Sequence, residues 1–174
     1  MRRKETFNIC FTGILFAVGY VLPFLTGQIP TIGNMFCPMH LPVLICGFIC
    51  GWKYGLFLGI VLPLFRSLTL SMPPLYPTAI AMAFEMGAYG LITGLLNKNT
   101  DKPLNIVLRL LVAMLAGRLV WGTVMWMFAL TNYVIEFNLT TFVMGAFITA
   151  WPGIITHLVL VPLTVLTYRK LENN

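Results

Sequence analysis

The chain has 174 residues, of which 59% are hydrophobic and only 9% are charged, and its formal net charge is +6. This composition lies far outside that of soluble globular proteins, so residues 1–174 are predicted to form a single integral membrane domain in a lipid bilayer. In a soluble protein the positive charge would indicate nucleic-acid binding. In a membrane protein the distribution of basic residues instead indicates how the chain is oriented in the bilayer, so no nucleic-acid partner is expected.

Six apolar helices are predicted in chain order, which makes the expected fold an all-α, six-transmembrane-helix bundle. The first apolar run is long enough to span and lacks a small-x-small cleavage site, so we expect it to remain as a helix and not to be a signal peptide. The second has about a dozen residues, too few to cross a hydrocarbon core of ~30 Å comfortably. The predicted ranges are 7–25, 38–51, 54–71, 76–97, 104–130 and 140–168.

Basic residues gather on one side of this bundle. Lysine and arginine occur at both ends of the chain and near the connections after the second and fourth helices, whereas the segments 26–37, 72–75 and 131–139 contain none. By the positive-inside rule, both termini are predicted to be cytoplasmic. The outer segment 26–37, between helices one and two, is too long for a tight hairpin and too apolar to be freely solvated. It is expected to fold back over the helix ends, either as a lid or as an ordinary connector.

Small residues recur at four-residue spacing, which places each pair on one helix face and lets a neighbouring backbone approach closely. Most of these pairs are expected to serve packing inside the chain. Gly13 and Ala17 in the first helix form one such pair, and one such face is expected to be free to serve a partner protein.

Three charged residues, Arg66, Glu85 and Arg118, fall at similar depths within the predicted spans. Charges at this depth are costly unless they face one another or water. One interpretation is a structural ion-pair network. The other is a binding site, because two arginines and one glutamate leave one positive charge, which an anionic ligand group, most simply a carboxylate, would balance.

Aromatic and polar residues near these charges extend the candidate site. Trp121 shares a helix face with Arg118, and Trp151 belongs to an Ala-Trp-Pro-Gly segment that should break the sixth helix near mid-membrane and turn the indole inward. His40 is expected near the outer mouth. The candidate substrate-binding residues are Asn34, His40, Arg66, Glu85, Arg118, Trp121, Asn132 and Trp151.

Several chemistries find no support in the sequence. There is no phosphate-binding glycine loop, no His-Glu-x-x-His, no nucleophile-elbow serine and no aspartate cluster, and the four cysteines follow no metal spacing. We therefore expect no enzyme activity, no catalytic residue, no metal and no cofactor. Any energy for transport must come from a gradient or from another protein.

With these features the sequence resembles the substrate-binding S components of the energy-coupling factor (ECF) vitamin transporters of bacteria. The resemblance rests on six helices in under 200 residues, the Gly13-x-x-x-Ala17 pair, and the stretch from Pro-Met-His-Leu-Pro-Val to Pro-Leu-Phe-Arg-Ser at 38–67. It implies a vitamin-binding subunit of the bacterial plasma membrane, with the vitamin held on the outer side beneath the loop between helices one and two. It also implies docking of the first helix on a transmembrane coupling subunit that works with two ATPases. The family motif is typically Ala-x-x-x-Ala, and Gly13 should still permit close approach.

The excess positive charge favours pantothenate as the vitamin, ahead of pyridoxine or a pyrimidine precursor, for which Glu85 would accept a hydrogen bond. Two functions of other classes remain open. A gradient-driven small-solute carrier would normally have inverted repeats and several mid-membrane acids, whereas no convincing repeat is found here. A non-transporting assembly subunit of a membrane complex would explain the small-residue faces without any ligand.

Overall fold

The computed structural model describes residues 2–25, 29, 33, 35–97, 102–131 and 137–172, and every element assigned in them is helical. Among these residues, five helices are long and apolar enough to cross a membrane, which supports the predicted all-α membrane class. The elements are α1 (Arg2–Leu25), α3 (His40–Cys50), α4 (Trp52–Leu70), η1 (Leu75–Ala79), α5 (Ile80–Leu95), α6 (Pro103–Leu130), α7 (Leu139–Val143), η2 (Met144–Ile148) and α8 (Trp151–Glu172).

Two predicted helices differ from the expected six spans. α3 has 11 residues and therefore rises only about 16 Å, too little to cross a membrane. The predicted helix 140–168 is divided into α7, η2 and α8, with the interruption at Thr149–Ala150. The break thus lies directly before the Trp-Pro-Gly triplet that was expected to cause it.

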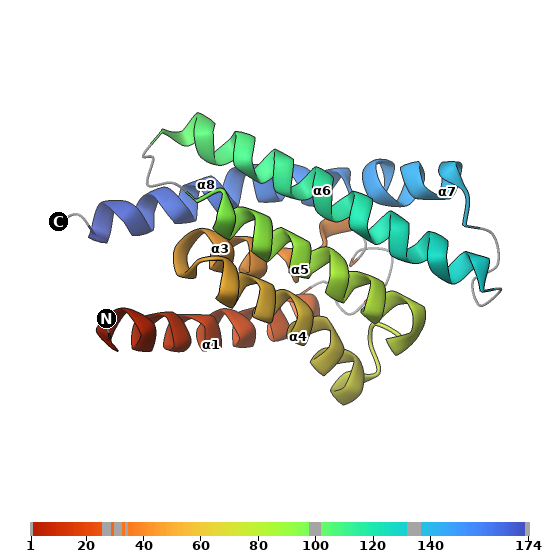
Figure 1. Cartoon of the computed structure of the whole chain (residues 1–174), viewed down its shortest axis with the longest axis horizontal. Helices are drawn as coiled ribbons and strands as arrows, with labels where there is room; N and C mark the ends of the chain where they lie inside the picture. Colours follow the sequence, from red (N-terminus) through yellow and green to blue (C-terminus); the bar gives the residue numbers. More distant parts are fainter. Residues whose placement is uncertain are drawn as a thin grey trace.

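The two ends of the bundle differ in what they contain. The N- and C-termini and the turn between α3 and α4 lie at one end, which we call the terminal end (Figure 1). The opposite end, which we call the cavity end, holds the ends of α1 and α4 and the segment with α7 and η2.

The short helix α3 forms the centre of the core. Nine of its 11 residues are buried, and it packs against α1, α4, α5 and α8. Because neighbouring helices surround it, its short length exposes little polar backbone to lipid. At its C-terminal end the Asn97 side chain donates to the Phe48 carbonyl at 2.6 Å. Gly51 then turns the chain into α4 with φ of +91°, a conformation that glycine adopts without strain.

Glycines bring α4 and α5 together backbone to backbone. A Cβ atom placed on Gly55 would lie 2.7 Å from the carbonyl oxygen of Gly90, closer than real side chains allow. This is the close packing that the four-residue spacing predicted inside the chain. Gly13 on α1 is different, since a Cβ there would meet nothing within 4 Å. Both Gly13 and Ala17 are exposed on the surface of the bundle.

Candidate functional site

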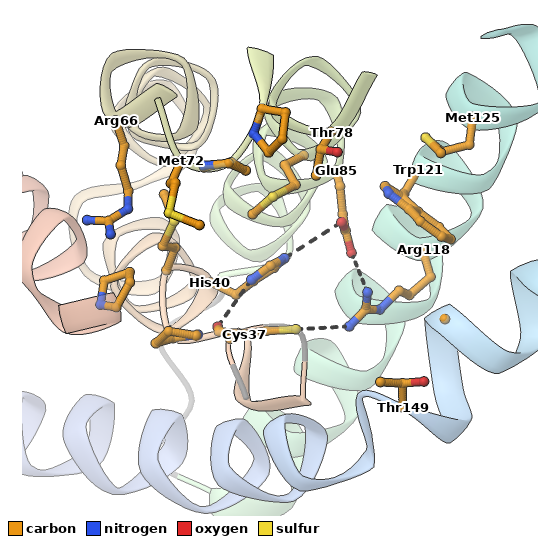
Figure 2. A pocket seen from close by; sticks show the side chains of 18 of the residues that line it. Cys37, His40, Arg66, Met72, Thr78, Glu85, Arg118, Trp121, Met125 and Thr149 are labelled. Carbon is orange, nitrogen blue, oxygen red and sulfur yellow. Dashed lines mark hydrogen bonds and ion pairs between the residues drawn. The ribbon is translucent and has the colours of Figure 1, made fainter. Parts of the chain in front are cut away.

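A cavity of about 580 Å³ lies at the cavity end of the bundle. Its walls come from α4, α5 and α6, from the segments that flank α3 and η1, and from the break before α8 (Figure 2). The lining side chains include Pro23, Cys37, Met39, His40, Arg66, Met72, Pro74, Thr78, Met82, Glu85, Arg118, Trp121, Met125 and Thr149.

The late start of α3 explains why there is room for this cavity. The chain reaches α3 through a turn in which the His40 amide donates to the Cys37 carbonyl at 3.0 Å. Residues 37–40 line the cavity, and helix α3 continues from His40 toward the terminal end. A full-length second helix would fill the volume that the cavity occupies.

Glu85 of α5 lies at the centre of a buried polar cluster. Its Oε1 atom is 2.9 Å from Nη1 of Arg118 on α6 and accepts a hydrogen bond of 2.7 Å from the Tyr89 hydroxyl. Both contacts favour an ionised carboxylate. Glu85 is 2% exposed and Arg118 is 8% exposed, so the pair is shielded from bulk solvent. Two of the three charges predicted at one depth therefore form an ion pair.

His40 brings a second group to Glu85. Its Nδ1 atom lies 3.1 Å from the Cys37 carbonyl oxygen, and its Nε2 atom lies 3.7 Å from Oε2 of Glu85. The second distance is longer than a hydrogen bond, and Nε2 is buried without a hydrogen-bond partner. The sequence predicts His40 near the outer mouth, and the structure places it in the cavity wall (Figure 2).

Arg118 keeps donor capacity beyond its bond to Glu85. Its Nε atom is buried without a hydrogen-bond partner, and Nη2 lies 3.8 Å from Sγ of Cys37. Burial raises the pKa of the Cys37 thiol, although the neighbouring Arg118 opposes this rise. A protonated thiol is a weak acceptor, so this contact does little to satisfy the guanidinium.

Arg66 of α4 lies on the other side of the cavity, toward α1 (Figure 2). Its Nη1 atom donates to the Tyr20 carbonyl. Its guanidinium carbon lies 5.7 Å from the ring centre of Tyr20 and 5.0 Å from that of Phe24. Among the described residues, no carboxylate lies within ion-pair distance of Arg66. Of the two interpretations of the three charges, the ion-pair network therefore includes Glu85 and Arg118 but not this arginine.

The remaining predicted residues divide into three groups. Trp121 lines the cavity, and its ring centre lies 5.6 Å from that of Phe137. Trp151 is 57% exposed and is absent from the described lining, so the expectation that it turns inward is wrong. Asn34 and Asn132 lie outside the described residues.

Sequence reasoning missed Cys37 and Tyr89. Tyr89 follows Glu85 by four residues and therefore shares its helix face, a spacing that would have indicated the contact. Cys37 had no such signal, because its position depends on how the segment before α3 folds. Within the described ranges, no three His, Cys, Asp or Glu side chains come together as metal ligands.

The comparisons with known proteins give one match. The family model described as ECF transporter, substrate-specific component, matches residues 7–167. No curated protein and no solved structure matches the chain.

Proposed function

The chain belongs to the substrate-specific components of ECF transporters, and on this premise we propose that it binds a small water-soluble vitamin with a carboxylate, pantothenate before pyridoxine or a pyrimidine precursor. The family consists of transporter subunits and not of enzymes, and membership implies a small-molecule substrate and partners from the ECF module. The proposed setting is the bacterial plasma membrane, with one domain over residues 1–174, cytoplasmic termini and six helices within the membrane, of which the short α3 does not span it alone.

The charge of the cavity is the observation that supports this ligand class. Its described lining contains two arginines and one glutamate, and the glutamate is paired with one of the arginines. A ligand carboxylate would balance the remaining positive charge. Trp121, Met82 and Met125 add an apolar wall, and the volume of about 580 Å³ lies in the range usual for small-molecule sites.

Identification of the bound molecule tests the proposed ligand directly. We expect protein purified from cells grown in rich medium to carry pantothenate, detected by mass spectrometry after denaturation. Isothermal titration of the emptied protein should then give tighter binding of pantothenate than of pyridoxine. Tighter binding of pyridoxine would reverse the ranking, and the absence of any co-purifying or titratable vitamin would favour an assembly subunit.

Gly13 and Ala17 are proposed to dock the protein on a coupling subunit that works with two ATPases. The support is that both residues are exposed and that nothing lies within 4 Å of a Cβ built on Gly13. Gly13→Leu should therefore block close helix approach and reduce complex formation and uptake, while vitamin binding by the isolated subunit is unchanged. Loss of binding and thermal stability together would instead mean that the face serves internal packing.

The energy source provides a separate test. Reconstituted alone in liposomes with ATP, the protein should give no concentrative uptake, because the sequence contains no nucleotide-binding motif. Uptake driven by a proton or sodium gradient alone would contradict the proposal and indicate a gradient-driven carrier.

A further inference from the structure

The two sides of the cavity differ in charge. On the side of α5 and α6, the carboxylate of Glu85 and the guanidinium of Arg118 neutralise each other across 2.9 Å. On the side of α4, Arg66 has no such partner among the described residues. The excess positive charge of the cavity therefore belongs to Arg66 and not to the cluster as a whole.

The contacts of Arg66 hold it in place without balancing its charge. One nitrogen donates to the Tyr20 carbonyl, and the rings of Tyr20 and Phe24 lie 5.7 Å and 5.0 Å from the guanidinium carbon. A guanidinium has five N–H donors, and its planar fork matches both oxygens of a carboxylate. At 2% exposure a cation without a counter-charge is costly. An anionic ligand group would offset that cost.

The side of Glu85 is unsuited to a second carboxylate. The carbonyl of Cys37 can only accept a hydrogen bond, so the His40 Nδ1 atom 3.1 Å away is the donor in that contact. The His40 Nε2 atom is buried without a hydrogen-bond partner and lies 3.7 Å from Oε2 of Glu85. A ligand hydroxyl can both donate and accept, so it can bond to both atoms. A ligand carboxylate would bring a second anion beside Glu85 and repel it.

We propose that Arg66 holds the anionic end of the substrate and that His40 and Glu85 receive a hydroxyl at its other end. The substrate is thus a hydroxy acid lying across the cavity in one orientation, with its apolar body against Met72, which lies between Arg66 and Glu85 in Figure 2. This assignment rests on the proposed function, and it selects Arg66 over Arg118 as the residue that recognises the acid. Arg118 is a positioning residue here, since it acts by holding Glu85.

The test compares pantothenate with pantothenol, the alcohol that lacks the carboxylate, by isothermal titration of the purified full chain in detergent. We expect the wild type to bind the acid about ten- to hundredfold more tightly than the alcohol, the usual effect of one charge-assisted hydrogen bond. Arg66→Gln should bring this ratio to about one while leaving the affinity for the alcohol within about threefold of the wild type. Arg118→Gln should weaken both compounds and preserve the ratio.

Arg109→Gln is the matched control, because Arg109 lies on α6 outside the described cavity lining and undergoes the same change. It should leave both affinities unchanged. The acid-to-alcohol ratio is measured within one preparation, so a partly unfolded sample does not alter it. If Arg66→Gln cannot be purified, Arg66→Lys replaces it and should give a ratio between one and the wild-type value, because the charge remains but the fork is lost.

The outcomes separate the two proposals. Binding of pantothenate with an unchanged ratio in the Arg66 variants, or a ratio abolished by Arg118→Gln, overturns the assignment of Arg66 alone. Equal binding of acid and alcohol by the wild type also overturns it. Binding of neither compound overturns the proposed ligand, and this assignment with it.

Discussion

The terminal half and the cavity half of the bundle are built by the same helices in opposite ways. Toward the terminal end, α4 and α5 touch through Gly55 and Gly90, and α3 fills the space beside them. Toward the cavity end, the same helices carry Arg66 and Glu85, and α3 is absent beyond His40. Close backbone packing and an open volume therefore follow one another along a single pair of helices.

This difference indicates a division of labour between stability and recognition. Glycine contacts maximise packing between helices in a membrane, where burial of apolar side chains away from water contributes nothing further. The polar groups of the cavity are costly in the same environment. The packing of the terminal half must therefore offset the free-energy cost of burying polar groups in the cavity half. Substitutions in the two halves should have different effects.

The largest effect is expected at Glu85, in the cavity half. Glu85→Ala leaves Arg118 buried without its counter-charge, which typically costs about 3–5 kcal/mol. We expect a large fall in thermal stability in detergent, and Arg118→Ala added to it should cost much less than the two single changes summed. Glu5→Ala is the control, since Glu5 is exposed in the first turn of α1. Additive effects of the two changes would contradict a mutually dependent pair.

An intermediate effect is expected at Gly90, in the terminal half. Gly90→Ala places a Cβ against the backbone of Gly55, which cannot move as a side chain would. Overpacking of this kind costs about 1–3 kcal/mol. Gly13→Ala adds the same atom where nothing lies within 4 Å and should change stability by less than about 0.5 kcal/mol. Equal melting temperatures for the two variants would show that the glycine contact does not hold α4 and α5 together.

The smallest effect is expected at Trp151, which belongs to neither the closed contact nor the cavity wall. Trp151→Leu should change the vitamin dissociation constant by less than about threefold, because the indole is 57% exposed. Trp121→Leu, the same change within the lining, should weaken binding clearly. If titration shows that the two variants lose equal affinity, the cavity wall extends farther than its described lining.

The helices and the depths of the charged residues could be predicted from the sequence, because hydropathy and the number of residues from the helix end determine them. Hydropathy identifies apolar segments, and a rise of ~1.5 Å per residue gives depth. Depth was enough to bring Glu85 and Arg118 together. It could not tell that Arg66 lies on the opposite side, because the rotation of α4 about its axis depends on packing against α1.

The error at Trp151 has the same origin. The Ala-Trp-Pro-Gly segment predicted an interruption, and the structure has one at Thr149–Ala150. The direction of a side chain beside a break depends on how the chain re-enters the helix, and no pattern in the sequence records that rotation. The place of His40 in the cavity wall likewise depends on local folding, because it comes from the turn at 37–40.

The length of the short helix α3 also sets the depth of the cavity. Its C-terminal end is held by Gly51 and by the bond from Asn97 to the Phe48 carbonyl, so changes in its length are taken up at His40. Each residue added there would raise the cavity floor by about 1.5 Å, and each residue removed would lower it. Insertions and deletions at the His40 end of α3 can therefore adapt a chain of this architecture to shorter or longer substrates, without changes in the surrounding helices.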